Sequence, residues 1–219
     1  MRSSLTMLGI VIGISAVILI VSIGQGSLKF ITSELSIFGT DFFGVLSGSG
    51  FQAAFTGGQR NLTIDDADAI RNDTSITNIK SVVPIAIASV PVSANRVDKQ
   101  IVIRGVTDEA IDIIKPTILN GTFITQEQYL TATRVAVIGT DVSVDFFGED
   151  TDPVGEIIRI GKRPFRVIGV ARSTNALLGG QINNTVIIPV NVLLDQILGQ
   201  KANLQQIGIR VENSDYINQ

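Results

Sequence analysis

The first candidate for chemistry is a group of three aspartates within four positions, Asp65, Asp66 and Asp68. Neighbouring carboxylates can serve as general acid and base in a hydrolase. They stand, however, at the start of a predicted helix, where Thr63 is the N-cap and Asp66 completes an acidic version of the capping box. Acidic side chains in the first turn also complement the helix macrodipole. We therefore interpret the three aspartates as a helix start and not as a catalytic group.

The second acidic stretch is the densest in the chain and comprises Asp141, Asp145, Glu149, Asp150 and Asp152. A calcium-binding loop places its ligands at alternate positions around a sharp glycine turn, and this spacing does not match that pattern. The stretch is therefore predicted to be a solvated surface.

A candidate phosphate-binding loop lies between Gly155 and Lys162. Five residues separate Gly155 from Gly161, whereas a Walker motif has four, and Arg163 stands where that motif requires Ser or Thr. Apolar residues alternate with arginines on both sides of the second glycine, which predicts a β-hairpin turning at residues 161–164. The segment is thus not a Walker motif.

The composition removes several classes of function. The chain contains no cysteine and no histidine, which excludes a zinc or iron–sulfur site, a cysteine nucleophile and a histidine-based triad. The net charge is −3 and no run of Lys or Arg is present, which argues against a nucleic-acid surface. We therefore expect a protein that is not an enzyme and that binds no cofactor, no metal and no nucleic acid.

The elements that would position any site begin with an uncharged stretch, residues 7–26. As an α-helix, about 20 residues span about 30 Å, the thickness of the hydrocarbon core of a bilayer. A cleaved signal peptide is the alternative, but its apolar region is usually about 7 to 15 residues long and ends in an A-x-A-like site, which "SIGQGS" lacks. We therefore predict a retained transmembrane helix in contact with membrane lipid.

Two features of this helix predict its packing and its orientation. Gly9 and Gly13 form a GxxxG motif, which lets another membrane helix approach closely. Arg2 precedes the span with no acidic residue nearby, so the positive-inside rule places the N-terminus in the cytoplasm. The residues after the span are then expected on the outer side of the membrane.

An apolar seam follows the span, formed by Leu28, Ile31, Leu35 and Phe38 at intervals of three, four and three. This spacing is typical of one face of a helix that continues out of the membrane as a stalk. Gly39 is a suitable C-terminal end for that helix. An apolar stripe outside the bilayer must be buried, so we expect the seam to pack on the outer domain or on a partner helix.

The remainder of the chain is rich in β-branched segments bounded by Gly, Pro or Asn, which predict strands, the first at residues 42–46. Short helices are expected between some of them, at residues 108–114, 141–147 and 192–198. Clustered strands with few intervening helices predict the α+β class and not a regular βαβ repeat.

Four of these segments together resemble a known family: "RSSLTMLGIVIGISAVILIVSIGQG", "LTIDDADAI", "RVAVIGTDVSVDFFGEDTDPVGEIIRIGKRPFRVIGV" and "VIIPV". They are similar to the first membrane helix and the extracytoplasmic core of MacB/FtsX-type ABC transporter permeases. Permeases of this family have four membrane helices, with the large outer domain between the first and the second. Only the first membrane helix and the outer domain are recognisable in these 219 residues.

The resemblance implies a particular domain organisation. Residues 1–39 would form the transmembrane helix and its stalk. A two-lobed, mixed α/β extracytoplasmic domain would follow, with a Porter-like lobe at residues 40–92 and 184–219. The Porter-like lobe would be incomplete at its C-terminus. Residues 93–183 would form a second, β-rich lobe inserted between the two segments of the first.

The implied function is that of a permease subunit in a MacB-like ABC transporter of the cell (inner) membrane. Such a permease pairs with a second copy as a homodimer and works with a cytoplasmic ABC ATPase, fused or separate. Its outer domain couples ATP hydrolysis to export or to mechanotransmission outside the membrane, and a membrane-fusion protein is a further expected partner. Two alternatives stay open: a membrane-anchored binding module that acts without an ATPase, and an anchored hydrolase that uses its carboxylates.

Overall fold

The computed structural model describes residues 2–35, 42–47, 62–73, 78–173, 182–199 and 203–211. The chain divides into two compact units, Met1–Gly39 and Thr40–Gln219.

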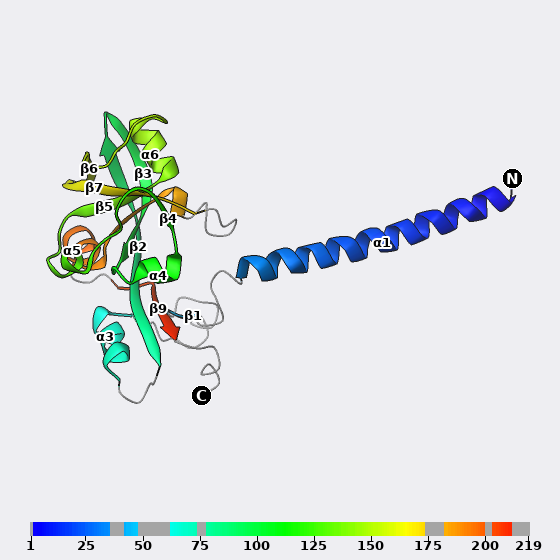
Figure 1. Ribbon diagram of the computed structural model, residues 1–219, viewed down its shortest axis with the longest axis horizontal. Coiled ribbons are helices and arrows are strands. Elements are labelled where there is room, and N and C mark those ends of the chain that lie inside the picture. The colour runs from blue at the N-terminus through cyan, green and yellow to red at the C-terminus, as the bar shows by residue number, and fades with distance from the viewer. Residues whose placement is uncertain are drawn as a thin grey trace. The chain divides into compact units, whose positions relative to one another are not determined.

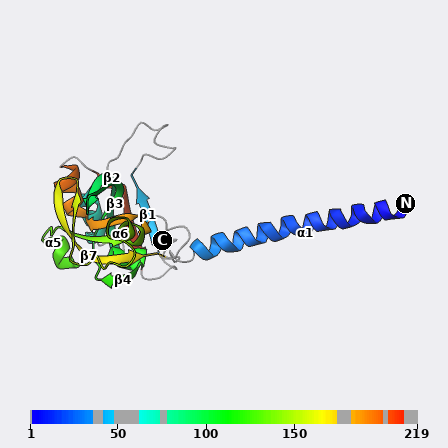
Figure 2. The same ribbon diagram turned by 90° about the horizontal axis from the view of Figure 1, so that it is seen from above.

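The first unit contains one long helix, α1 (Arg2–Leu35), drawn in blue in Figure 2. Its segment Gly9–Ser27 is long and apolar enough to cross a membrane. Many of its residues are β-branched, which disfavours a helix in water, but in a lipid environment the backbone must satisfy its own hydrogen bonds and a helix does so within one segment. The predicted helix through the apolar segment is confirmed, and it continues for eight residues beyond Ser27.

The second unit is a mixed α/β domain. Its strands are β1 (Phe42–Leu46), β2 (Ile79–Ala94), β3 (Val97–Val106), β4 (Thr117–Gly121), β5 (Val135–Gly139), β6 (Ile157–Ile160), β7 (Arg163–Arg172), β8 (Thr185–Pro189) and β9 (Gln206–Val211). Its helices are α3 (Ile64–Asn72), α4 (Ala110–Ile114), α5 (Gln126–Leu130), α6 (Thr140–Phe147) and the π-helix η2 (Val192–Leu198). The expectation of a mixed α/β domain behind an apolar N-terminal helix is confirmed.

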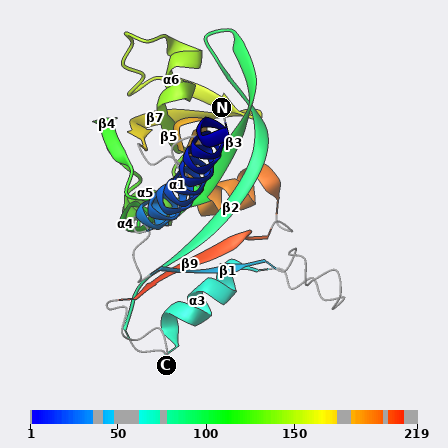
Figure 3. The same ribbon diagram turned by 90° about the vertical axis from the view of Figure 1, so that its right-hand side faces the viewer.

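Strand β2 is long enough to belong to two parts of the sheet at once. Its first half, from Ile79 to Ile85, pairs antiparallel with β9, which in turn pairs with β1. Its second half, from Ala86 to Ala94, pairs antiparallel with β3. Figures 1 and 3 show β2 running from the region of α3, β1 and β9 to the region of β3 and α6. One strand therefore joins the three-stranded part formed by β1, β9 and β2 to the larger part of the sheet.

The larger part of the sheet mixes parallel and antiparallel pairs. From β3 the order continues through β8, β5, β7 and β4, and β6 pairs with both β2 and β7. The pairs β3–β8 and β5–β7 are parallel, whereas β5–β8 and β4–β7 are antiparallel. Strands β5 and β8 are buried along their whole length, as expected for central strands that are covered on both faces.

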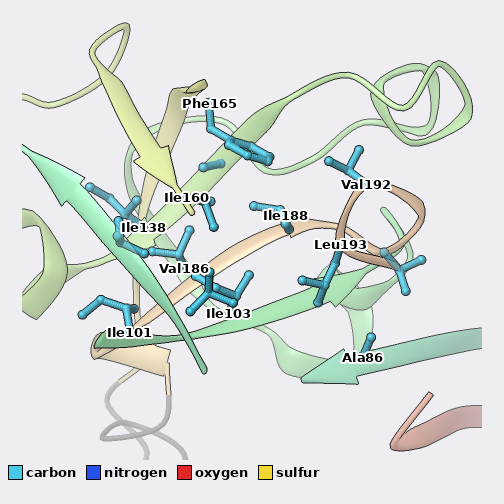
Figure 4. Close-up of a cluster of buried hydrophobic side chains, with 14 of the residues drawn as sticks. Ala86, Ile101, Ile103, Ile138, Ile160, Phe165, Val186, Ile188, Val192 and Leu193 are labelled. Atoms are coloured by element: carbon cyan, nitrogen blue, oxygen red, sulfur yellow. The ribbon is translucent and has the colours of Figure 1, made fainter. Parts of the chain in front are cut away.

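The hydrophobic core lies on both faces of the sheet, because successive strand residues point to opposite faces. Within β8, Val186 and Ile188 belong to one buried cluster and Ile187 to another. Figure 4 shows part of the first cluster, in which Ile188 lies near Leu193 of η2 and Val186 lies near Ile103 of β3. This cluster also contains Ala67 of α3 and Ile207 of β9, so it reaches both parts of the sheet.

Several local predictions are confirmed. The helices expected at 108–114, 141–147 and 192–198 correspond to α4, α6 and η2. The hairpin expected at 161–164 is formed by β6 and β7, which pair antiparallel around a turn at Gly161, a residue with a positive φ of 59°. The capping box is also present: the Thr63 hydroxyl accepts from the backbone N–H of Asp66, and the Asp66 carboxylate accepts from the backbone N–H of Thr63.

Candidate functional site at the junction of the two sheet parts

The predicted membrane-helix contact residues, Gly9 and Gly13, both lie in α1. They are four positions apart in sequence, so they share one face of the helix. A Cβ atom built on either glycine would meet nothing within 4 Å inside the first unit. The helix therefore offers a shallow surface here, and its packing against another helix stays a prediction.

The predicted stalk seam is described only as far as its backbone. Leu28, Ile31 and Leu35 belong to α1, which ends at Leu35, and their spacing places them on one helical face. Phe38 and the expected helix end at Gly39 lie outside the described residues. The burial of the seam stays a prediction.

A polar network that sequence reasoning missed lies where the two parts of the sheet meet. Arg71, in the last turn of α3, contacts Asp68 of its own helix with 2.7 Å between Nη1 and Oδ1. Its Nη2 donates to the backbone oxygen of Val82 in β2 at 2.7 Å and lies 3.7 Å from Oε2 of Glu109. The same Oε2 accepts from the backbone N–H of Val82 at 3.2 Å. Arg71 and Glu109 thus hold both backbone groups of one strand residue.

A pocket of about 180 Å³ lies beside this network and is lined by Arg71, Thr107, Asp108, Glu109, Gln126, Tyr129 and Leu130. These residues come from α3, from the connection between β3 and α4, and from α5. Thr125 fixes the start of α5 by a capping box, since its hydroxyl accepts from the backbone N–H of Gln128 and its own N–H donates to the Gln128 side chain. The pocket is therefore built from three elements at the junction.

The π-helix η2 ties α5 and the start of β5 to the core. The Asn191 side chain, at the N-cap of η2, donates to the backbone oxygen of Tyr129. The Nε of Arg134 donates to Oε1 of Gln196 at 2.8 Å. A π-helix is rare and often occurs at functional positions, and this one packs against β3 and β8 beneath the junction.

The electrostatics at the junction are dominated by acidic side chains. Burial raises the pKa of the Tyr129 hydroxyl, and the negative charges of Asp68, Asp108 and Glu109 raise it further, while Arg71 opposes them. Burial also lowers the pKa of Arg104 in β3. Three carboxylates thus act on the Tyr129 hydroxyl against one guanidinium.

Two of the acidic residues singled out in the sequence have structural roles. Asp66 caps α3, and its pKa is lowered by the hydrogen bonds from the backbone and the side chain of Thr63. Asp145 of α6 forms an ion pair with Lys99 of β3, with 2.6 Å between Oδ1 and Nζ. Within the described part of the chain, no group of three or more acidic side chains has an arrangement that could hold a metal ion.

Comparison with known proteins identifies the family. The family model described as the MacB-like periplasmic core domain matches residues 3–219, which is nearly the whole chain. The chain belongs to this family. It is therefore a MacB-like periplasmic domain of the ABC transporter permease family, as the sequence resemblance predicted.

Curated relatives of this MacB-like domain include two proteins named macrolide export ATP-binding/permease protein MacB. The one from Bordetella avium is 36% identical over 220 residues, covering 98% of this chain and 32% of that protein. The one from Acinetobacter baylyi is 30% identical over 214 residues, covering 97% of this chain and 32% of that protein. The chain thus spans about a third of the length of the curated relatives that it matches.

Two solved structures share the fold of this MacB-like domain. The periplasmic region of MacB from Actinobacillus actinomycetemcomitans superposes with a TM-score of 0.70 at 21% identity, covering 84% of this chain and 82% of that chain. The extracellular domain of the noncanonic ABC-type transporter YknZ from Gram-positive bacteria gives a TM-score of 0.63 at 21% identity, covering 81% of this chain and 86% of that chain. An apolar N-terminal helix followed by this fold indicates a membrane-anchored periplasmic-type domain.

Proposed function

We propose that this MacB-like domain couples ATP hydrolysis by a cytoplasmic ABC ATPase, fused or separate, to export or to mechanical work outside the membrane. The names of the curated relatives, which combine ATP-binding and permease functions with macrolide export, support this proposal. The domain itself would carry no catalytic step. A homodimer of permeases and a membrane-fusion or other extracytoplasmic partner belong to the same proposal, as does an N-terminus in the cytoplasm.

The observation that carries the proposal is the continuity of the sheet across the junction. Only residues 36–41 separate α1 from β1 in the chain. Strand β1 is hydrogen-bonded to β9, β9 to the first half of β2, and the second half of β2 to β3. A displacement that enters at β1 therefore has a hydrogen-bonded path into the larger part of the sheet.

Two further contacts favour movement of the domain as one body. The Arg71 network fastens α3 to Val82 of β2 and to Glu109 before α4. The first hydrophobic cluster runs from Ala67 and Ile207 to Phe165 without a break. Packed interiors transmit strain because they are dense and hardly compressible.

We also propose a division into two lobes that meet along β2. A Porter-like lobe would contain β1, α3, β9 and the first half of β2, and the inserted lobe the rest of the sheet. This differs from the division expected at residues 92 and 183, because the second half of β2 and the whole of β8 pair with strands of the larger sheet part. Proteolysis of the purified chain tests where the lobes separate.

The experiment on coupling uses a cysteine pair, since these 219 residues contain no cysteine and any elsewhere in the full-length permease can be replaced first. Arg71→Cys and Glu109→Cys are introduced together into the full-length permease and joined by a short bis-methanethiosulfonate reagent. If the junction moves as one body, the cross-link replaces the fastening that the two substitutions remove, so the cross-linked protein still co-purifies with its ATPase and exports at least as well as the untreated double variant. The single variants treated with the same reagent serve as controls. Loss of export on cross-linking, with recovery after reduction, would overturn the one-body mechanism.

The alternative is a membrane-anchored binding module that acts without an ATPase, and the pocket at the junction favours it. Co-purification decides between the two functions. We expect an ATPase, or an ATPase domain of the same polypeptide, to accompany the permease in mild detergent. Absence of any ATPase from a functional complex would favour the binding module.

A further inference from the structure

The pocket at the junction contains a buried polar atom without a partner. Thr107, directly after β3, is 1% exposed and lines the pocket. Its backbone oxygen accepts from Ala110, but its hydroxyl has no hydrogen-bond partner within the described structure. Leaving a buried hydroxyl unpaired costs free energy, because its bonds to water are lost and not replaced. Such an atom beside a cavity points to a ligand group.

The charge of the pocket is the second observation. Two carboxylates, Asp108 and Glu109, and one guanidinium, Arg71, line it. The guanidinium is already engaged by Asp68, by Glu109 and by the backbone oxygen of Val82. Among the residues that the structure describes, the Asp108 carboxylate has no ion pair and no side-chain hydrogen bond. The charge left without a partner in the pocket is therefore negative.

Tyr129 supplies the aromatic side of the same pocket. Its ring is half-buried, and the pKa of its hydroxyl is raised by burial and by the neighbouring carboxylates. A cation is attracted both by a carboxylate and by the face of an aromatic ring. Leu130, which is 69% exposed, adds apolar surface at the same wall.

The pocket volume fits a small organic group. About 180 Å³ is far more than the roughly 10 to 15 Å³ that a single water needs. The Thr107 hydroxyl and the Asp108 carboxylate can both accept hydrogen bonds, and so can the Gln126 amide oxygen and the Tyr129 hydroxyl, which also line the pocket. An ammonium group offers three donors and no acceptor.

We propose that this pocket binds the ammonium group of a small organic amine, with Asp108 as its counter-ion and the Thr107 hydroxyl as an acceptor. The Tyr129 ring and Leu130 contact the carbon chain. The proposal concerns a binding site on this domain and does not rest on the coupling function.

The test is calorimetric titration of the full 219-residue chain in a non-ionic detergent with butylammonium chloride. The neutral analogue butan-1-ol has the same carbon chain and tests the role of the charge. We expect saturable binding of butylammonium in about the millimolar range, as is usual for a ligand of about five non-hydrogen atoms, and none of butan-1-ol. Equal binding of the two probes would overturn the proposal.

Matched variants test whether Asp108 is the counter-ion of the bound ammonium group. Asp108→Asn is expected to weaken butylammonium binding about tenfold, as for loss of a charge-assisted hydrogen bond. Asp98→Asn removes one carboxylate from the β2–β3 hairpin and is expected to leave binding unchanged, so it controls for non-specific attraction to an acidic protein. An equal loss in both variants would contradict the assigned site.

Two substitutions test whether the Thr107 hydroxyl takes part in binding. Thr107→Val keeps the shape and removes the hydroxyl, so binding is expected to fall severalfold, whereas Thr107→Ser keeps the hydroxyl and is expected to bind as the wild type does. Circular dichroism of each variant verifies its folding. If Thr107→Val does not fold, the Thr107→Ser and Asp108→Asn pair decides the outcome, and wild-type affinity in Asp108→Asn refutes the proposal.

Discussion

The Nη2 atom of Arg71 lies 2.7 Å from the backbone oxygen of Val82, so a side chain at the end of α3 is fastened to the middle of the first half of β2. The Val82 N–H is held in turn by Glu109. We expect Arg71→Ala to lower the free energy of unfolding by about 1 kcal/mol, because a charged donor to a strand carbonyl is lost from a site that is about one-third exposed.

Arg71→Lys is the matched variant, since lysine keeps the charge but lacks the planar fork that contacts Asp68 and Val82 together. We expect it to recover only part of the loss. Urea unfolding of the domain measures both variants. Equal stability of Arg71→Ala and the wild type would mean that the network does not fasten the junction.

The capping box of α3 predicts a dependence of stability on pH. Hydrogen bonds from Thr63 lower the pKa of Asp66 from its ordinary value of 3.8. A carboxylate with a lowered pKa in the folded state stabilises the fold above its unfolded pKa. This contribution is lost as the pH falls from about 4 through the folded pKa.

Asp66→Asn is expected to flatten this part of the stability profile below about pH 4, as measured by thermal unfolding. Asp66→Glu keeps a carboxylate at the capping-box position and is the matched variant, which we expect to retain the fall in stability below about pH 4. Thr63→Ala removes the cap itself and is expected to cost about 1 kcal/mol at neutral pH. An unchanged profile in Asp66→Asn would contradict the capping role.

The proposed orientation in the membrane is tested by single cysteines in a chain that has none. Ser3→Cys lies before the apolar segment, and Ser173→Cys lies at the end of β7. A membrane-impermeant thiol reagent applied to intact cells, with the outer membrane permeabilised where there is one, is expected to label position 173 and not position 3. The reverse labelling would invert the topology.

Much of the local structure was predictable because its signals are local. The apolar segment of α1, the capping box at Thr63 and the hairpin turn at Gly161 each depend on residues within a few positions of one another. The contacts between α3, β2 and the residues before α4 were not predictable. Arg71, Val82 and Glu109 come together only because β2 and β3 pair and α3 packs on β2.

The pocket was missed for the same reason. Thr107 gives no sequence signal, since an isolated threonine after a strand is usually a turn residue, and its unpaired hydroxyl becomes visible only when α5 packs nearby. The parallel pairing of β3 with β8 likewise joins segments far apart in the chain. Periodicity identifies a strand but not its partner.

The last prediction concerns the stalk. In a transporter that transmits movement from the membrane to an outer domain, the helix that leaves the membrane must remain continuous, and α1 does continue past the apolar segment to Leu35. Ile31→Pro removes a backbone hydrogen bond and clashes with the preceding turn, which costs about 3 kcal/mol or more and bends the helix. Leu35→Ala keeps the helix and only reduces its apolar face, at a cost of about 2 to 5 kcal/mol if the site is fully buried and less otherwise.

We therefore expect Ile31→Pro in the full-length permease to retain ATPase co-purification while losing export, and Leu35→Ala to lose export in part. Both quantities are measured for each variant beside the wild type, and normal export by Ile31→Pro would show that the stalk is not a rigid transmitter.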